Sequence, residues 1–576
     1  MKTPSLLLLA AFGLSACATV SPGPPESPPS AAPVTVRIVG LNDFHGNLEP
    51  LRRPLRLADG KGELHEVQAG GAAWLASAVA EVRGRAEHSL VIAAGDLIGG
   101  SPLVSSIFLD EPAIGAMNMI GLDFNAVGNH EFDRGWRELR RMQQGGCEQH
   151  TLREPCAVEN PFPGARFRFL AANVITPDGS TLFPAWDVRR FETGRGSLEV
   201  GVIGLTLKDT PTLVTPSGVE GLTFTDEAEA INRAVEQLDA RGVRAIVVAV
   251  HQGLHTEVAW NDKSCGGVSG PLLDILRRVD ARVDLVISGH THNAYVCDFA
   301  AIDPARPFLV TSAGYGGSML TDITLSLDPA SGEVLARSAD NVVVQSAAPG
   351  AASAVFPAWE ENGTLSAYVA RYVEAARGES ERPVGRISGD GRKGGSSEET
   401  PLGNLIADAQ LAATRSAGAQ IALMNNSGIR APLVARADGT ISFGDIYAVQ
   451  PFGNTLVTKT FTGAQLLALL EQQFDGEGFV QTFSFSDGFA LAYDLRRPVG
   501  SRVVSATLNG APIDPAASYR VTMNSFLAAG GDSFTVFNQG TDSVTGPLDL
   551  DALEAWLRAA EIRQLPAEGR VTRIDG

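Results

Sequence analysis

The sequence has no surplus of positive charge. Its 576 residues include 46 Lys and Arg against 65 Asp and Glu, which gives a formal net charge of −19. Proteins that bind nucleic-acid polymers need a basic surface to displace counterions, so this balance argues against such a partner. The negative net charge does not exclude a small phosphorylated substrate that is held through a metal ion.

Long hydrophobic runs are also missing, so we expect no transmembrane helix, and the sequence shows neither an internal repeat nor a tract of like charges. The run Leu6–Phe12 follows the positive Lys2 and is too short to span a bilayer, which is typical of an export signal. Small residues then precede Cys17 in an arrangement that resembles the lipobox of bacterial lipoproteins. The resemblance implies cleavage before Cys17 and a lipid on that residue. The alternative is an ordinary signal peptide with an incidental cysteine.

Residues 18–33 are rich in Pro, Ser and Ala and carry a single charge, Glu26. Such a segment cannot bury a core, so we interpret it as a semi-rigid tether. The sequence therefore predicts an exported protein that is either anchored in the outer membrane, facing the periplasm or the cell surface, or periplasmic. The lipid anchor is the only membrane contact that we expect.

Cysteine is scarce, with five residues in the whole chain. Besides Cys17 these are Cys147, Cys156, Cys265 and Cys297. An even number in an exported chain suggests two disulfides, most simply Cys147–Cys156 and Cys265–Cys297. The alternative is four buried thiols.

A chain of this length exceeds what one hydrophobic core supports, so two or more domains are expected. Apolar, β-rich runs alternate with helical patterns in the first part of the chain; the runs are residues 34–39, 89–94, 122–127, 167–172, 198–205, 245–250 and 285–288. This alternation predicts an α/β fold with sheets covered by helices on both faces. A helical pattern over Trp359–Ala376 then links to a second unit with a helix over Leu402–Arg415. The predicted division is signal peptide 1–17, tether 18–33, first domain 34–345, linker and hinge helix 346–380, and second domain 381–576.

Metal-capable side chains follow the predicted strands. They fall in five segments: Asp43-Phe44-His45, Gly95-Asp96, Gly128-Asn129-His130, His251-Gln252-Gly253 and Gly289-His290-Thr291-His292. Asp-x-His and His-x-His place alternate residues on one side of an extended segment, so that both can face one ion. Imidazole and carboxylate ligands suit zinc or manganese, and the lack of cysteine among them argues against a structural zinc finger. Each segment alone could be a turn with a satisfied histidine, but together they predict a pair of divalent ions.

The order of these motifs resembles the calcineurin-like metallophosphoesterases. The segments Asn42–Gly46 and Gly128–Asp133 narrow the resemblance to the 5′-nucleotidase/UDP-sugar hydrolase family. The resemblance implies an N-terminal four-layered α/β/β/α metallophosphoesterase domain, which a linker helix joins to a C-terminal α+β nucleotide-binding domain. It also implies a large rotation of one domain against the other, and Trp359–Ala376 is our candidate for the hinge.

The resemblance assigns roles to nine residues of the first domain. It implies Asp43, His45 and His292 on one ion, Asn129, His251 and His290 on the other, and Asp96 as a bridge. His130 and Asp133 match the catalytic pair of the family. Several family members carry an amide where His292 stands, which leaves the metal preference open: zinc or manganese first, with magnesium, cobalt or calcium as alternatives. A water activated by the metals would attack phosphorus in line with the leaving oxygen.

The second domain offers candidates for substrate binding. Phe452 and Phe526 can sandwich a base, and Asp532 can accept hydrogen bonds from ribose hydroxyls. Asn425 and Arg430 can bind the ribose or phosphate side of the substrate, and Asn454, which follows Phe452 in the same motif, is a further candidate. Alternatively, both phenylalanines are core residues and Asp532 belongs to a turn. The family usually has an Arg just upstream of Glu399; here Arg392 and Lys393 are the nearest cations, and Arg392 is a candidate substitute.

The sequence thus predicts an exported dimetal phosphohydrolase that releases phosphate from nucleoside 5′-monophosphates, with UDP-sugars and other nucleotides as further candidates. The enzymatic alternative is a 2′,3′-cyclic-nucleotide 2′-phosphodiesterase/3′-nucleotidase. Outside enzymes, the alternatives are a non-catalytic nucleotide-binding surface lipoprotein and a structural surface protein. The oligomeric state stays open.

Overall fold

The computed structural model describes residues 32–59, 61–151, 153–194, 196–346, 353–395, 397–474 and 480–575, together with Met1. The predicted signal peptide, the lipidation residue Cys17 and most of the tether lie outside these residues. Within the described part of the chain, no helix is both long and apolar enough to cross a membrane.

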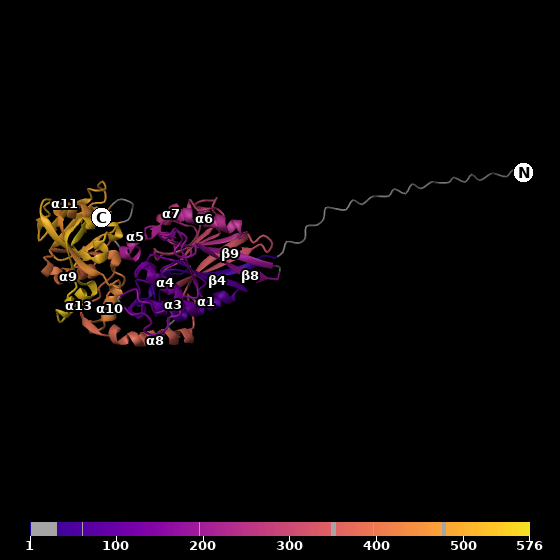
Figure 1. Ribbon diagram of the computed structural model, residues 1–576, viewed down its shortest axis with the longest axis horizontal. Helices are drawn as coiled ribbons and strands as arrows, with labels where there is room; N and C mark the ends of the chain where they lie inside the picture. Colours follow the sequence, from indigo (N-terminus) through magenta and orange to yellow (C-terminus); the bar gives the residue numbers. More distant parts are fainter. Residues whose placement is uncertain are drawn as a thin grey trace.

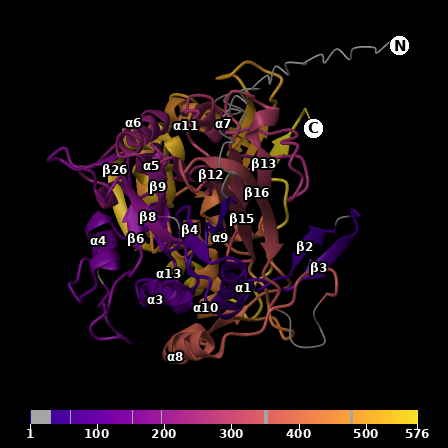
Figure 2. The same cartoon turned by 90° about the vertical axis from the view of Figure 1, so that its right-hand side faces the viewer.

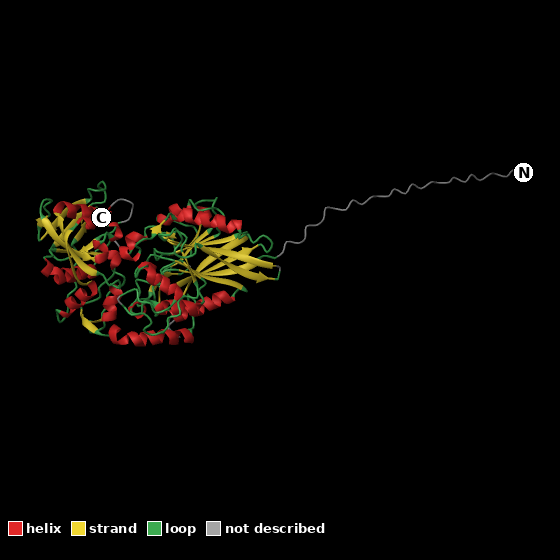
Figure 3. Ribbon diagram, viewed as in Figure 1, coloured by secondary structure: helices red, strands yellow, loops and turns green. Residues whose placement is uncertain are grey.

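Two six-stranded sheets form the first domain (Figures 1 and 3). The strand order of one sheet is β16 (Val334–Val343), β15 (Met319–Leu327), β1 (Val34–Leu41), β4 (His88–Ala93), β5 (Phe124–Ala126) and β6 (Arg168–Leu170). The order of the other is β13 (Ala294–Asp298), β14 (Leu309–Ala313), β12 (Leu285–Ser288), β11 (Ala245–His251), β9 (Gly196–Thr206) and β8 (Trp186–Thr193). The strands β1, β4, β5 and β6 run parallel, as do β9, β11, β12 and β14, so the carboxyl ends of each set lie at one end of their sheet.

The sheets pack face to face with helices outside them. Because side chains alternate along a strand, Val36 and Ile38 of β1 enter the apolar layer between the sheets, whereas Val39 and Leu41 face the outer helices. The helices α1 (Ala72–Gly84) and α3 (Glu111–Ile120) cover the first sheet, and α6 (Glu227–Ala240) and α7 (Pro271–Leu276) cover the second (Figure 2). The predicted four-layered α/β/β/α architecture is confirmed.

The helix α8 (Gly363–Ser380) connects the two domains along the outside of the first (Figure 1). The sequence predicted this helix over Trp359–Ala376, four residues too early at both ends. It begins later because the Asn362 side chain accepts a hydrogen bond from the backbone N–H of Leu365 at 3.0 Å and caps the helix. The Trp359 indole instead donates to a carbonyl of β16 at 2.8 Å.

A five-stranded sheet forms the centre of the second domain. Its order is β21 (Phe483–Phe485), β18 (Ile421–Asn425), β25 (Ser518–Asn524), β20 (Thr455–Thr462) and β26 (Thr541–Leu548). An apolar cluster joins α9 (Pro401–Thr414), α10 (Phe443–Val449) and α13 (Asp549–Arg558), and another joins this sheet to α11 (Gly463–Glu471). The predicted α+β class is confirmed, and the helix predicted over Leu402–Arg415 matches α9 within one residue at each end.

Both predicted disulfides are present. Cys147 is bonded to Cys156, and Cys265 is bonded to Cys297. The bounds of the predicted sequence division stay a prediction.

Candidate metal centre and adjoining pocket

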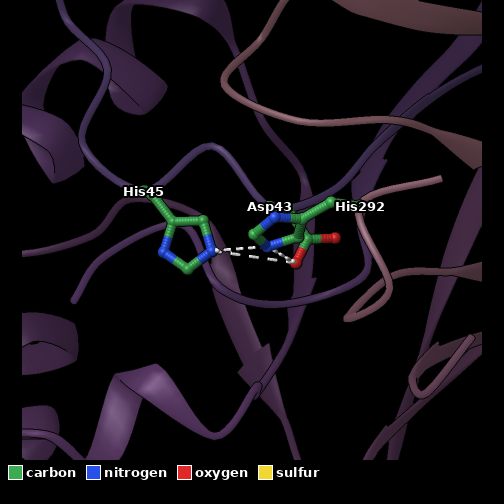
Figure 4. A group of neighbouring side chains, drawn as sticks. All are labelled: Asp43, His45 and His292. Carbon is green, nitrogen blue, oxygen red and sulfur yellow. Dashed lines mark hydrogen bonds and ion pairs between the residues drawn. The ribbon is translucent and has the colours of Figure 1, made fainter. Parts of the chain in front are cut away.

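Two groups of metal-capable side chains lie at the carboxyl ends of the parallel strands. Within each group the ligand atoms lie within 4.8 Å of one another; the groups are Asp43, His45 and His292 (Figure 4), and Asp96, His251 and His290. Each ligand ends or closely follows β1, β4, β11 or β12. Parallel strands therefore bring together residues that are distant in the sequence.

Asp96 belongs to the second group and also lies close to His45 of the first group. Its Oδ2 is 2.9 Å from His251 Nε2 and 3.6 Å from His45 Nε2. In the first group, Asp43 Oδ1 is 3.3 Å from His292 Nε2 and 3.8 Å from His45 Nε2. This is the arrangement expected of a carboxylate that serves both groups.

Backbone carbonyls orient two of the imidazoles. His45 Nδ1 lies 2.7 Å from the Gly99 carbonyl oxygen, and His251 Nδ1 lies 2.7 Å from that of Ala94. A carbonyl can only accept, so Nδ1 carries the proton in both rings, and Nε2 is the atom of each ring that is left for a metal ion. An outer hydrogen bond of this kind fixes a histidine as a metal ligand.

Asn129 adds a neutral oxygen beside these groups. Its Oδ1 is buried and has no hydrogen-bond partner, and Asn129 shares a cavity lining with His290. A buried acceptor without a partner costs free energy unless something absent from the protein chain binds it. Nitrogen and oxygen donors of this kind, oriented in two adjoining groups, fit a pair of divalent ions.

The backbone at the centre is strained. Five of the seven predicted ligands have positive φ angles: Asp43 (47°), His45 (45°), Asp96 (51°), His290 (69°) and His292 (58°). Residues other than glycine adopt this region at a cost of about 1–3 kcal/mol each, and such strain is concentrated at functional sites.

Glu131 holds the loops that carry two of the ligands. Its carboxylate accepts backbone N–H hydrogen bonds from Asp96 at 2.9 Å, Leu97 at 2.8 Å and Gly128 at 2.7 Å. Burial and the nearby Asp96 charge raise the pKa of Glu131 to about 8, against the lowering effect of these N–H donors. Glu131 therefore positions the loops after β4 and β5.

His130 and Asp133 form an ordered pair at the edge of the centre. His130 Nδ1 lies 2.9 Å from Asp133 Oδ2, which leaves Nε2 free. Burial lowers the pKa of His130, but the negative charges of Asp133 and Asp96 outweigh it and raise the pKa above its ordinary value. On its other side, the imidazole stacks on Phe452 of the second domain, with ring centres 5.7 Å apart and planes at 10°.

One cavity of about 310 Å³ adjoins the metal-capable groups and is lined by both domains. The first domain contributes Asn129, His130, Asp133, His290 and residues 213–215. The contributions of the second domain include Asn425, Arg430, Gln450, Phe452, Asn454, Phe526, Asp532 and Asp549. Both phenylalanines are partly exposed, so each can offer a ring face to a ligand.

Hydrogen bonds order the polar part of this cavity. Asp532 Oδ2 accepts from Asn425 Nδ2 at 2.9 Å and from the Ser427 hydroxyl at 2.7 Å. Asn454 Oδ1 accepts from the Ser525 hydroxyl at 3.0 Å. The Arg430 guanidinium lies 5.8 Å from the centre of the Phe452 ring, within cation–π range.

Two family models match the chain in succession. The calcineurin-like phosphoesterase model matches residues 36–294, and the model of the 5′-nucleotidase C-terminal domain matches residues 378–539. The chain belongs to the 5′-nucleotidase family. This family membership places the chain among metal-dependent phosphoester hydrolases and agrees with the resemblance that the motifs indicated.

Several relatives and solved structures align over most of the chain. The endonuclease YhcR of Bacillus subtilis (strain 168) is 31% identical over 530 residues, which cover 91% of this chain but 40% of that protein. A probable 5′-nucleotidase of Treponema pallidum is 26% identical over 566 residues, 87% of each chain. The crystal structure of a 5′-nucleotidase precursor from Thermus thermophilus is 28% identical, with a TM-score of 0.74 over 94% of this chain and all of that chain.

The structure brings the candidate 5′-nucleotidase site residues together. Six of the seven predicted metal ligands form the two metal-capable groups. The seventh, Asn129, lines the cavity together with His290 and the His130–Asp133 pair. All six predicted substrate-binding residues line the cavity too, so neither Phe452 nor Phe526 is a fully buried core residue. Their roles stay predictions.

The suggestion that Arg392 substitutes for the missing family arginine is wrong. Arg392 pairs with Glu398 at 2.5 Å and with Glu568 at 2.8 Å, and it lines a different pocket. Its neighbour Lys393 instead donates from Nζ to the Arg430 carbonyl at 3.3 Å. Two nearby carboxylates attract Arg392 away from the cavity.

Sequence reasoning missed several residues of the site. Ser427, Gln450 and Asp549 line the cavity, and Glu131 positions the metal-capable loops. Glu131 and Ser427 lie in motifs that carry other predicted site residues, but the sequence alone assigned no function to either. Nothing in the local sequence distinguishes Gln450 or Asp549 from ordinary helix-terminal residues.

Proposed function

We propose that this protein is an exported dimetal hydrolase that releases phosphate from nucleoside 5′-monophosphates. The observation that supports it most is that a single cavity joins His130 and the metal-capable groups to Phe452, Phe526 and Asp532. Metal-capable groups and two partly exposed aromatic rings at one cavity fit a molecule that carries both a phosphate and a base.

The predicted ligands would hold two divalent ions, with zinc or manganese best suited to the donors and magnesium, cobalt or calcium as alternatives. When bound, such ions polarise phosphoryl oxygens and lower the pKa of a water molecule. His130 presents its Nε2 side to the phosphoryl group while Asp133 holds Nδ1. Its positive charge stabilises the charge that develops during phosphoryl transfer.

The second domain would hold the nucleoside. Phe452 and Phe526 stack on the two faces of the base, and Asp532 accepts hydrogen bonds from the ribose hydroxyls. Asn425 supports this role, because its amide already orders the Asp532 carboxylate at 2.9 Å. Arg430 would carry its charge toward the phosphate, and Asn454 is a further candidate that lines the cavity.

We also infer that Cys17 carries a lipid and that the protein acts outside the cytoplasm, as the export signal predicts. The anchor then gives the only membrane contact. Mass spectrometry of Cys17 in membrane extracts tests this inference, and an unmodified residue 17 contradicts it.

The experiment for the proposed activity is a substrate panel on the soluble form that starts after Cys17. We expect phosphate release from AMP to exceed that from 3′-AMP, 2′,3′-cyclic AMP and UDP-glucose. Faster turnover of the cyclic and 3′ substrates supports the 2′,3′-cyclic phosphodiesterase/3′-nucleotidase instead. Nucleotide binding without turnover in added zinc or manganese supports a non-catalytic lipoprotein.

A further inference from the structure

Gln450 follows α10 directly and lies two residues before Phe452. Its side chain is 1% exposed, and neither Oε1 nor Nε2 has a hydrogen-bond partner. Gln450 nevertheless lines the cavity that contains Phe452 and Phe526. An amide with two free polar atoms therefore adjoins the aromatic slot.

A buried amide without partners is costly. Each buried donor or acceptor without a partner has lost its hydrogen bonds to water without a replacement. Gln473, an equally buried glutamine of the same domain, shows what a satisfied side chain looks like. It donates to the Leu470 carbonyl at 2.9 Å and accepts from the Phe483 N–H at 2.8 Å. Gln450 has the same burial without such bonds, which points to a partner outside the protein chain.

We propose that Gln450 reads the hydrogen-bonding edge of the base that stacks between Phe452 and Phe526. This inference rests on the proposed nucleotidase function and deepens it, because it assigns a residue to base recognition. The amide presents one acceptor and one pair of donors in a plane, and a flip about its terminal bond exchanges their places.

That chemistry suits each common base. Adenine and cytosine present an exocyclic N–H donor beside a ring nitrogen acceptor, and uracil and guanine present a ring N–H donor beside a carbonyl acceptor. One glutamine can therefore pair with any of the four by flipping. Gln450 gives a preference for substrates that have a base over those that lack one, with little selection among bases.

Several other polar side chains at the cavity already have hydrogen-bond partners within the protein. Asn454 Oδ1 is already occupied by Ser525, and Asn524 Nδ2 donates to Asn425 Oδ1 at 2.9 Å. Asn425 and Asp532 bind each other. The Gln450 amide thus has both of its polar groups available.

The test replaces Gln450 by methionine, which has similar length and no hydrogen-bonding amide. We expect Gln450→Met to lower kcat/KM for AMP about 10-fold or more, and at least ten times more than it lowers kcat/KM for ribose 5-phosphate. Purine riboside 5′-monophosphate, which lacks the exocyclic amino group, should lose less than AMP. Equal losses for AMP and ribose 5-phosphate, or no loss, would overturn the inference.

Thermal unfolding supplies a second readout that does not depend on turnover. Without nucleotide, Gln450→Met should keep or raise Tm, because it removes an unsatisfied amide, whereas the control Gln473→Met should lower Tm by breaking two hydrogen bonds. AMP should raise the Tm of the wild type more than that of Gln450→Met. A lower Tm of ligand-free Gln450→Met would show a structural amide and contradict the proposal. A wild type that is inert toward both AMP and ribose 5-phosphate would instead contradict the proposed function.

Discussion

Individual ligand residues of the metal centre adopt conformations that the folded surroundings impose. Asp43 and His45 have left-handed backbone, and their N–H groups donate to the carbonyls of Gly95 at 3.0 Å and Asp96 at 2.9 Å. Gly95 itself cannot be replaced without strain, since its φ is 87° and an added Cβ would lie 2.7 Å from His251 Nδ1. The loops after β1 and β4 thus form one unit that sets the positions of ligands on both.

His130 gives the sharpest residue-scale prediction. We expect His130→Ala to lower kcat for AMP by about 10²- to 10⁴-fold, because its charge acts on the transition state. The metal content should stay at the wild-type level, since His130 is not among the predicted ligands. Elemental analysis and phosphate release on the same preparation check both parts. Turnover close to wild type would remove His130 from the mechanism.

Asp284 gives a prediction for stability against pH. Burial raises the pKa of Asp284 to about 6, despite a hydrogen bond from the Ile246 N–H at 3.0 Å and the charge of Arg337. Because the pKa is higher in the folded state than in the unfolded one, the folded state binds this proton more tightly. Lowering the pH from about 7.5 to about 5 should therefore add about 1.4 kcal/mol to the unfolding free energy through this group.

The Asp284→Asn variant isolates that contribution. Chemical denaturation of both proteins at the two pH values should show the variant losing its advantage as the pH falls. The stability difference between variant and wild type should shrink by about 1.4 kcal/mol. An unchanged difference would mean that Asp284 titrates normally.

At the scale of elements, the sequence predicted seven strands of the two large sheets and the candidate ligands that follow them; the seven are β1, β4, β5, β6, β9, β11 and β12. It did not predict β8 or β13 to β16. Buried parallel strands appear in the sequence as continuous apolar runs. The polar residues just beyond such runs therefore lie at the carboxyl edge of the sheet. The start of α8 was missed because the apolar pattern extends back to Trp359, while the cap at Asn362 decides where the helix begins. The ion pairs of Arg392 and the burial of Gln450 depend on tertiary packing, which no local sequence pattern shows.

The Asn362 cap gives an element-scale prediction. Asn362→Ala should lower the unfolding free energy by about 1 kcal/mol, because it removes the acceptor for the Leu365 N–H. Denaturant titration measures the loss, and kcat for AMP should not change, since the helix start is remote from the cavity. No loss of stability would show that the first turn of α8 does not need its cap.

On the scale of the whole molecule, the two domains contact each other beside the cavity. Arg52 pairs with Asp445 at 2.6 Å, Arg53 lies 3.5 Å from Asp390, and the hydroxyls of Ser106 and Tyr447 are 2.8 Å apart. The domain rotation that we predict would break these contacts when a nucleotide enters or leaves. The long helix α8 packs on the first domain, so its C-terminal end is the place where such a rotation would begin.

Cross-linking tests this requirement. Arg53 and Asp390 are both about half exposed, so cysteines at the two positions can be joined by a short bismaleimide in the form that starts after Cys17. We expect the cross-link to slow AMP turnover strongly and to spare a small chromogenic phosphate ester. The single-cysteine variants treated with the same reagent are the controls. Unchanged AMP turnover in the cross-linked protein would show that domain rotation is not needed.

The proposed phosphohydrolase activity depends on seven side chains that hold a pair of metal ions beside His130. The most direct measurement is the divalent metal content of the purified wild type and of Asp96→Ala, with phosphate release from AMP measured on the same samples. We predict about two equivalents of metal per chain and rapid release in the wild type, and loss of both in Asp96→Ala, because Asp96 lies between the two ligand groups. A wild type that is metal-free and inert after incubation with zinc or manganese, or an Asp96→Ala variant that keeps both ions and full turnover, would contradict the account.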